Sequence, residues 1–238
     1  MKIRISAMAA LVAAMAFGPQ ASADVISFQF NGGGFSGSGY FTVAPNVAPA
    51  DPNPSCGTVG NNPCRTDPAG AYAIVGITGT FSDTSNGIAN AAITGLVPIN
   101  PANERDPVFD PLVPSSLSFI DYTPGKALTY NNLFFPNGSP IDCNYPFYGT
   151  FLDVFGVAFT VDGGYTVNMW GDGNEPGLGL TYGVGVTSGG SLLAYQFDGV
   201  TATTAEPSTL ALLGAGLFGV LGWWKRSKRS AEGVAALG

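Results

Sequence analysis

The chain has 238 residues, among them 34 glycines, but only 11% of its residues are charged and none is histidine. The missing histidine excludes a Ser-His-Asp triad, a Cys-His pair and histidine ligation of zinc or haem. Lysine and arginine are nearly absent from the long middle of the chain, where almost all Asp and Glu lie. Because phosphate binding needs clustered cations, this acidic body excludes nucleic acid as a partner.

Residues 1–23 have the three parts of a secretory signal peptide. Two cations stand near the start, an apolar stretch follows, and a Gly-Pro pair ends it. Ala21 and Ala23 satisfy the small-x-small rule for cleavage, here in front of Asp24. We therefore predict an N-terminal signal helix and export of the chain. A transmembrane anchor is the alternative, although the apolar stretch is short for one.

A second apolar segment, residues 208–224, lies near the C-terminus and contains no charge. A helix of this length rises about 25 Å, which barely spans a bilayer core. Tryptophans would lie at the membrane interface, and the cations behind them would stay on the cytoplasmic side. We predict a single transmembrane helix with a stop-transfer cluster. Its expected residues are Leu210, Leu213, Gly216, Trp223, Trp224, Lys225, Arg226, Lys228 and Arg229.

The sequence Ala205-Glu206-Pro207, followed by the apolar segment and the basic cluster, resembles a PEP-CTERM sorting signal over residues 206–229. The resemblance implies recognition by exosortase, a membrane-embedded cysteine transpeptidase, after insertion into the inner membrane. It also implies processing near the motif and delivery to the cell surface or extracellular space of a Gram-negative bacterium. Ala205 replaces the first proline of the pattern, and a tail (230–238) follows the cluster. A retained membrane anchor is therefore the alternative.

Residues 24–205 are predicted to form one β-rich extracytoplasmic domain. Short β-branched and aromatic runs alternate with Gly, Pro, Asn and Asp turns, among them the hairpin signal at 162–164. This spacing predicts an all-β fold, an antiparallel β-sandwich or jelly roll. Proline-rich loops are expected at 44–70 and 98–116. The expected strands are 25–30, 40–43, 72–81, 128–130, 133–135, 151–161, 165–170, 180–187 and 192–198.

Three cysteines suit an oxidising compartment. Cys56 and Cys64 lie in the first proline-rich loop, and their spacing predicts a local disulfide. In the chain-entropy model such a bond contributes about 2–3 kcal/mol to stability. Cys143 is the odd cysteine, so pairings that include it stay open.

The stretch from Trp170 to Glu175 places oxygen-bearing side chains between glycines. Asp172, Asn174 and Glu175 are candidate calcium ligands, because Ca²⁺ binds six to eight oxygens in flexible loops. The EF-hand pattern is absent, and an ordinary turn is the alternative. We expect no other metal and no cofactor.

No catalytic residue is predicted, and we expect a non-enzymatic surface or matrix protein. One alternative is a carbohydrate-binding or adhesive module for exopolysaccharide, which would need a row of exposed aromatics such as Tyr145, Tyr148, Trp170 and Tyr182. The other is a secreted glycoside hydrolase, which would need two carboxylates that line a cleft.

Overall fold

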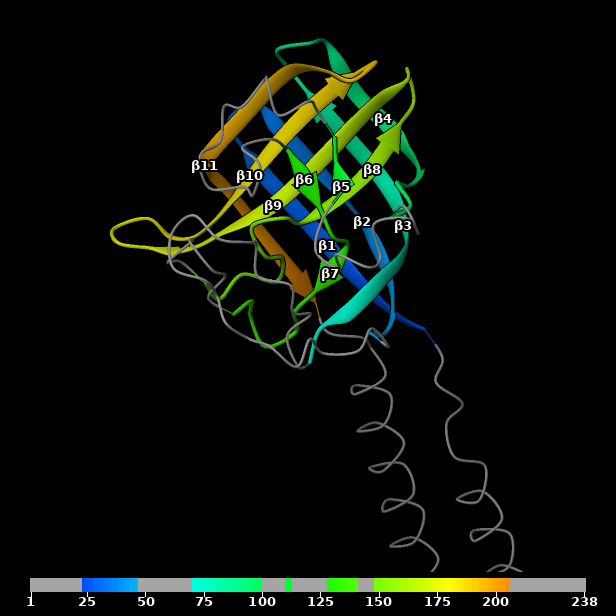
Figure 1. Ribbon diagram of the computed structural model, residues 1–238. Coiled ribbons are helices and arrows are strands. Elements are labelled where there is room, and N and C mark those ends of the chain that lie inside the picture. Colours follow the sequence, from blue (N-terminus) through cyan, green and yellow to red (C-terminus); the bar gives the residue numbers. More distant parts are fainter. Residues whose placement is uncertain (1–22, 47–69, 100–109, 113–127, 141–147, 206–238) are drawn as a thin grey trace, which may run out of the picture. The chain divides into compact units, whose positions relative to one another are not determined.

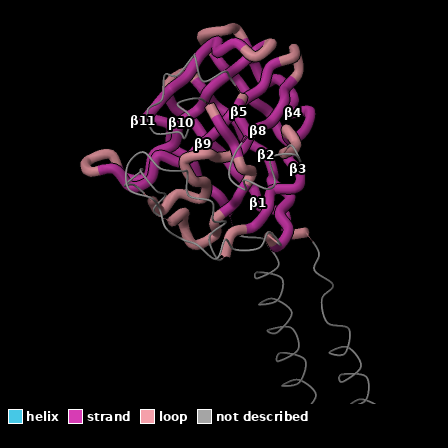
Figure 2. Tube along the Cα trace, viewed as in Figure 1, coloured by secondary structure: helices cyan, strands magenta, loops and turns pink. Residues whose placement is uncertain are grey.

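The computed structural model describes residues 23–46, 70–99, 110–112, 128–140 and 148–205, which contain strands but no helix (Figure 2). The strands are β1 (Asp24–Gly32), β2 (Phe35–Pro45), β3 (Tyr72–Asp83), β4 (Ile88–Leu96), β5 (Asp110–Pro111), β6 (Thr129–Tyr130), β7 (Leu133–Phe134), β8 (Val157–Val161), β9 (Tyr165–Glu175), β10 (Gly179–Ser188) and β11 (Ser191–Ala205). A first compact unit ends at Thr204, and of the second unit only Ala205 is described. The two predicted terminal helices and all three cysteines lie outside the described residues.

Eight strands close into an antiparallel barrel in the order β1, β2, β3, β4, β8, β9, β10 and β11 (Figure 1). The ring is complete because β2 pairs with both β1 and β3, while β11 pairs with β1. The prediction of an all-β fold is confirmed, whereas the β-sandwich or jelly roll is wrong. A sandwich leaves edge strands with unpaired backbone groups, and full closure removes those edges.

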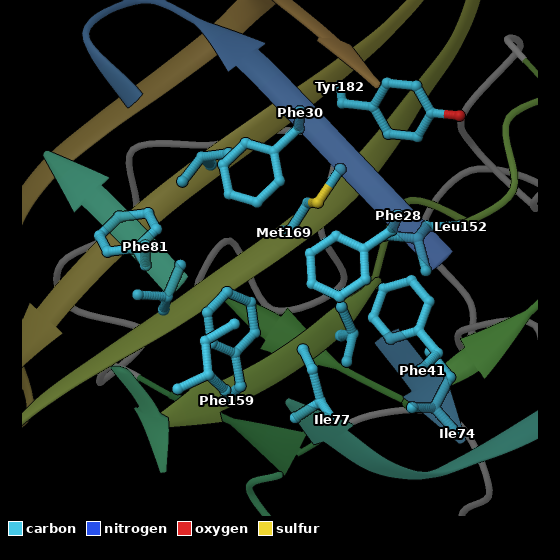
Figure 3. Packing of buried hydrophobic residues seen from close by; sticks show 14 of the residues in the cluster. Phe28, Phe30, Phe41, Ile74, Ile77, Phe81, Leu152, Phe159, Met169 and Tyr182 are labelled. Carbon is cyan, nitrogen blue, oxygen red and sulfur yellow. The ribbon is translucent and has the colours of Figure 1, made fainter. Parts of the chain in front are cut away.

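The interior of the barrel is filled with apolar side chains. Along β1, Ile26, Phe28 and Phe30 are buried, whereas Val25 before them and Gln29 between Phe28 and Phe30 are exposed, as the two-residue period of a strand requires. Aromatic rings dominate the filling (Figure 3). The rings of Phe28 and Phe41 stack with centroids 4.3 Å apart. An eight-stranded barrel has an interior that side chains can fill completely, and this one is filled in that way.

The two ends of the barrel differ in their connections. Because the strands alternate in direction, the turns at 33–34, 84–87, 162–164 and 189–190 all lie at one end, which we call the turn end. The opposite end, which we call the terminal end, holds the start of β1 and the last residue of β11. The β9–β10 turn lies there as well, and the two long connections, β2–β3 and β4–β8, leave and re-enter the barrel at this end. The chain therefore enters and leaves the barrel at the same end.

A buried polar network attaches the β4–β8 connection to the barrel. The Asp153 carboxylate accepts hydrogen bonds from the Asn131 side chain at 2.6 Å and from the Gly156 backbone N–H at 2.9 Å. Asn132 accepts a bond from the Ala158 N–H, at the start of β8. These bonds hold residues 150–156 in an irregular path, so the strand predicted at 151–161 begins only at Val157.

Replacement of Gly156 by alanine is expected to destabilise the barrel by about 3 kcal/mol or more, because strain and overpacking combine. Gly156 has φ +71°, and a Cβ there would lie 1.9 Å from the Met169 carbonyl oxygen. Urea unfolding of the full chain in mild detergent measures the loss.

Gly87→Ala is the matched control, since Gly87 has φ +69° but nothing within 4 Å of an added Cβ. This variant should lose only about 1–2 kcal/mol of stability, which is the cost of the backbone strain alone. Equal losses for the two variants would contradict the close approach at Gly156.

Candidate functional site

Two β-bulges lie on either side of Gly183, in the middle of β10. On β9, Asp172 is the extra residue where the β9–β10 register shifts. On β11, residues 197–199 stand opposite Gly183 alone. A bulge re-aims the side chains around it. Here the two bulges bring the carboxylates of Asp172 and Asp198 into electrostatic contact across β10.

The indole of Trp170 covers this position on the outer face of the barrel wall. Met169 points into the barrel, so its neighbour Trp170 points to the outer face. Trp170 is nevertheless fully buried. A Cβ on Gly183 would lie 2.0 Å from Cε2 of the indole, so only glycine leaves room for the ring. Leu128 and Phe197 pack against the indole from the outside. The indole Nε1–H donates a hydrogen bond to Oδ1 of Asp172 at 2.8 Å.

Burial raises the pKa of Asp172 to about 7. The Trp170 indole and the backbone N–H of Asp198 donate hydrogen bonds that favour the charged form, while the charges of Asp198 and Glu175 oppose it. The described ranges contain no lysine or arginine that could offset this acidity. Asp172 therefore binds its proton in the folded protein at pH values where an exposed aspartate has lost it.

The predicted calcium ligands differ in their surroundings. Asp172 is buried beneath Trp170, Asn174 is exposed and Glu175 is half-buried at the end of β9. Within the described ranges, no group of three or more acidic, histidine or cysteine side chains is arranged to hold a metal ion. The turn itself lies further along the chain, at 176–178.

The aromatic residues proposed for sugar stacking do not form a row. Trp170 and Tyr182 are buried, and the Tyr182 hydroxyl accepts a hydrogen bond from the Phe151 N–H. Tyr148 is exposed, and Tyr145 lies outside the described residues. A buried ring cannot present its face to a pyranose, so two of the four candidates are excluded from this role.

Two residues of the buried polar clusters were missed from the sequence. Asp198 follows an apolar run, and its φ of +48° together with Gly199 at +103° marks the bulge. An Asp-Gly pair inside a predicted strand is the signal that could have indicated it. Asp153 also accepts local hydrogen bonds from the Phe155 and Gly156 N–H groups, but no local pattern indicates its bond with Asn131, which lies 22 positions away.

The predicted sorting residues begin where the barrel ends. Ala205 is the last residue of β11, and Glu206, Pro207 and the residues after them lie outside the described ranges. The predicted cleavage position precedes Asp24, the first residue of β1. No helix within the described ranges has the length and apolar character needed to cross a membrane.

Comparison with protein-family models finds a PEP-CTERM protein-sorting motif at residues 205–227. The chain therefore carries a PEP-CTERM sorting motif at these residues. Such motifs are recognised by exosortase, which makes this an exported protein sorted toward the cell surface. No curated protein and no solved structure matches the chain. The motif therefore accounts for the C-terminal segment, whereas no comparison describes the barrel.

Gly183→Ala is expected to destabilise the barrel by about 1–3 kcal/mol, because the rigid indole of Trp170 must move. Thermal unfolding followed by circular dichroism measures the effect. Gly95→Ala in β4 is the control, because an added Cβ there has nothing within 4 Å. A Gly183 variant as stable as the Gly95 variant would contradict the packing of the indole on β10.

The stability of the protein is expected to fall as pH rises from about 4 to 7. Because the folded pKa of Asp172 is raised, the folded state binds more protons than the unfolded state in this window. The shift corresponds to roughly 4 kcal/mol at most. Asp172→Asn keeps an acceptor for the Trp170 indole and should flatten this part of the pH profile.

Urea midpoints measured across this pH range test the prediction. The control is Asp162→Asn, in the exposed β8–β9 turn, which should keep the slope of the parent protein. A slope that persists in the Asp172 variant would assign the dependence to another group.

Proposed function

We propose that this protein is a non-enzymatic component of the cell surface or extracellular matrix. In this proposal the barrel is the exported domain, and the C-terminal segment is the sorting signal that exosortase recognises. The sorting motif at 205–227 is the observation that carries the proposal. The motif begins at Ala205, the residue with which β11 ends, so the barrel and the sorting signal are directly joined in the chain.

The packing of the barrel supports a role without catalysis. Its interior is occupied by apolar side chains, with Phe41 and Phe81 fully buried. The three deeply buried carboxylates accept structural hydrogen bonds. Asp83 accepts bonds from Ser85 and Asn86, Asp153 from Asn131, and Asp172 from the indole of Trp170. A substrate could not reach Asp172, which has no exposed surface. No arrangement of the described side chains favours the hydrolase over this function.

The exposed tyrosines do not support exopolysaccharide binding as a second function. The exposed tyrosines of the described ranges, Tyr40, Tyr148 and Tyr195, come from β2, the β4–β8 connection and β11. Side chains dispersed in this way do not form the row of stacking faces that the sequence-based hypothesis requires.

Intact-mass analysis of the mature protein from its native host tests the proposed sorting. We expect the loss of residues 1–23 and a new C-terminus close to Glu206. Replacement of Glu206 and Pro207 together by alanine should leave the C-terminal segment attached, because the motif is altered. A wild-type protein that retains residues 208–238 would contradict processing and favour a retained anchor.

Thr203→Ala is the control for this variant. Thr203 is an exposed residue of β11 just before the motif, and its replacement should leave processing unchanged. The same spectra, recorded with and without a reductant, count the disulfides and so test the predicted Cys56–Cys64 bond.

A further inference from the structure

Exposed large apolar side chains gather at the terminal end of the barrel. There Leu178 is 61% exposed and Tyr148 is 53% exposed. We define the apolar rim as these two residues together with Val25, Val75, Ile99 and Leu180. The turns at the opposite end consist of Gly, Ser, Thr, Asn and Asp. Soluble surfaces carry scattered apolar residues, but their collection at one end indicates a contact surface.

The densest part of the rim is formed by the β9–β10 hairpin and the segment beside it. The Asn174 backbone N–H donates a hydrogen bond to the Tyr148 carbonyl at 2.9 Å, which fixes the two segments together. A Cβ on Gly149 would contact the Leu180 side chain at 3.5 Å. Leu180 and Tyr148 therefore belong to one patch, and Leu178 follows at the turn. Figure 1 shows this hairpin projecting beyond the barrel wall.

The covalent structure restricts what can lie near this end. β11 ends at Ala205, where the sorting motif begins, so no linker separates them. The uncharged stretch starts at Ser208, only three residues further on. Even a fully extended chain spans about 10 Å over three residues. A bilayer that receives residues 208–224 thus lies within reach of the barrel end at which β11 stops.

The charge of the barrel indicates which kind of contact is possible. Within the described ranges there is no lysine or arginine, and Asp24 and Glu175 add negative charge at the terminal end. The described part of the barrel therefore offers no cation that could attract anionic headgroups. Insertion of apolar side chains into the interface needs no cation and increases with the apolar area buried.

We propose that the apolar rim contacts the lipid bilayer into which the sorting segment is inserted. The side chains of Leu178, Leu180 and Tyr148 insert into the membrane interface. This inference rests on the proposed sorting function, because the C-terminal segment is what brings the bilayer to this end. The contact lasts until the segment is removed, and processing then releases the barrel from the surface.

Site-specific photo-crosslinking in the full chain tests the contact. A benzophenone amino acid replaces Leu178 or Tyr148, and the chain is reconstituted in phosphatidylcholine vesicles, irradiated and analysed by mass spectrometry. Leu193 and Tyr195 are matched controls, since they are exposed residues of the same types near the turn end. We expect lipid adducts several-fold more abundant at 178 and 148 than at 193 and 195, with a yield that does not fall in high salt.

Three results would overturn the inference. Equal lipid labelling at all four positions would remove the preference for one end. Adducts of position 178 with a second protein chain would assign the rim to self-association. A yield that falls in high salt would show an electrostatic contact.

Flotation of the vesicles on a density gradient separates this failure from failure of the proposed function. A chain that floats without rim adducts overturns the membrane contact alone. A chain that does not float overturns the anchoring step, and the rim contact with it. Circular dichroism of each labelled chain verifies that its strand content equals that of the parent.

Discussion

The whole architecture depends on β1 being paired along both of its sides. β2 follows it directly and forms a hairpin, whereas β11 reaches it from the far end of the domain, with the Thr201 hydroxyl bonded to the Asn31 carbonyl. Without the second pairing the sheet would have two edges and a strip of exposed aromatic side chains. With it, every long strand has two neighbours, and the phenylalanines of β1, β2 and β3 belong to the closed core.

The β4–β8 connection packs in two places: Phe134, Phe151 and Leu152 join the main core, whereas Leu128 packs on the outer face of the wall. Trp170 is the main residue of that contact, because its indole lies across β10 where Gly183 and Gly185 have no side chains. The same contact brings an aspartate out of water. Asp172 keeps two hydrogen-bond donors there, but the loss of hydration outweighs them, and its pKa rises. The outer cluster therefore gains packing and acquires a dependence on pH.

The sequence predicted the strands well, because alternation is a local property that survives in any β fold. The run at 165–170 and the turn at 162–164 are in place, and β1 begins one residue before the predicted run. The closure was missed because alternation is the same in a sandwich and in a barrel, and no local pattern states that β11 pairs with β1. The path of 150–156 was missed for a similar reason, since it depends on Asn131 and Asp153, which come together only in the fold.

The candidate sites also differ in whether a local pattern or only the folded structure reveals them. The sorting motif could be found from the sequence because it is a contiguous pattern of a dipeptide, an apolar segment and a cationic cluster, and the family comparison agrees with it. The calcium candidate was built in the same way, from neighbours along the chain. Its members differ in burial, because neighbours on a strand point to opposite faces and the bulge at Asp172 changes that alternation. The carbohydrate-binding alternative required an exposed Trp170, and no local pattern indicated that glycines on β10 would receive its indole.

The position of the closing strand links the fold to the order of export. In a chain that leaves the cell from its N-terminus, β1 emerges first and β11 last, and the Thr201–Asn31 bond joins residues 170 positions apart. The ring cannot close before β11 has emerged, and the next residues to follow are those of the sorting motif. A membrane segment that halts the chain at this point holds back nothing that the barrel needs for closure. The barrel therefore needs no linker in order to fold, although Ala205 is both the last residue of β11 and the first residue of the sorting motif.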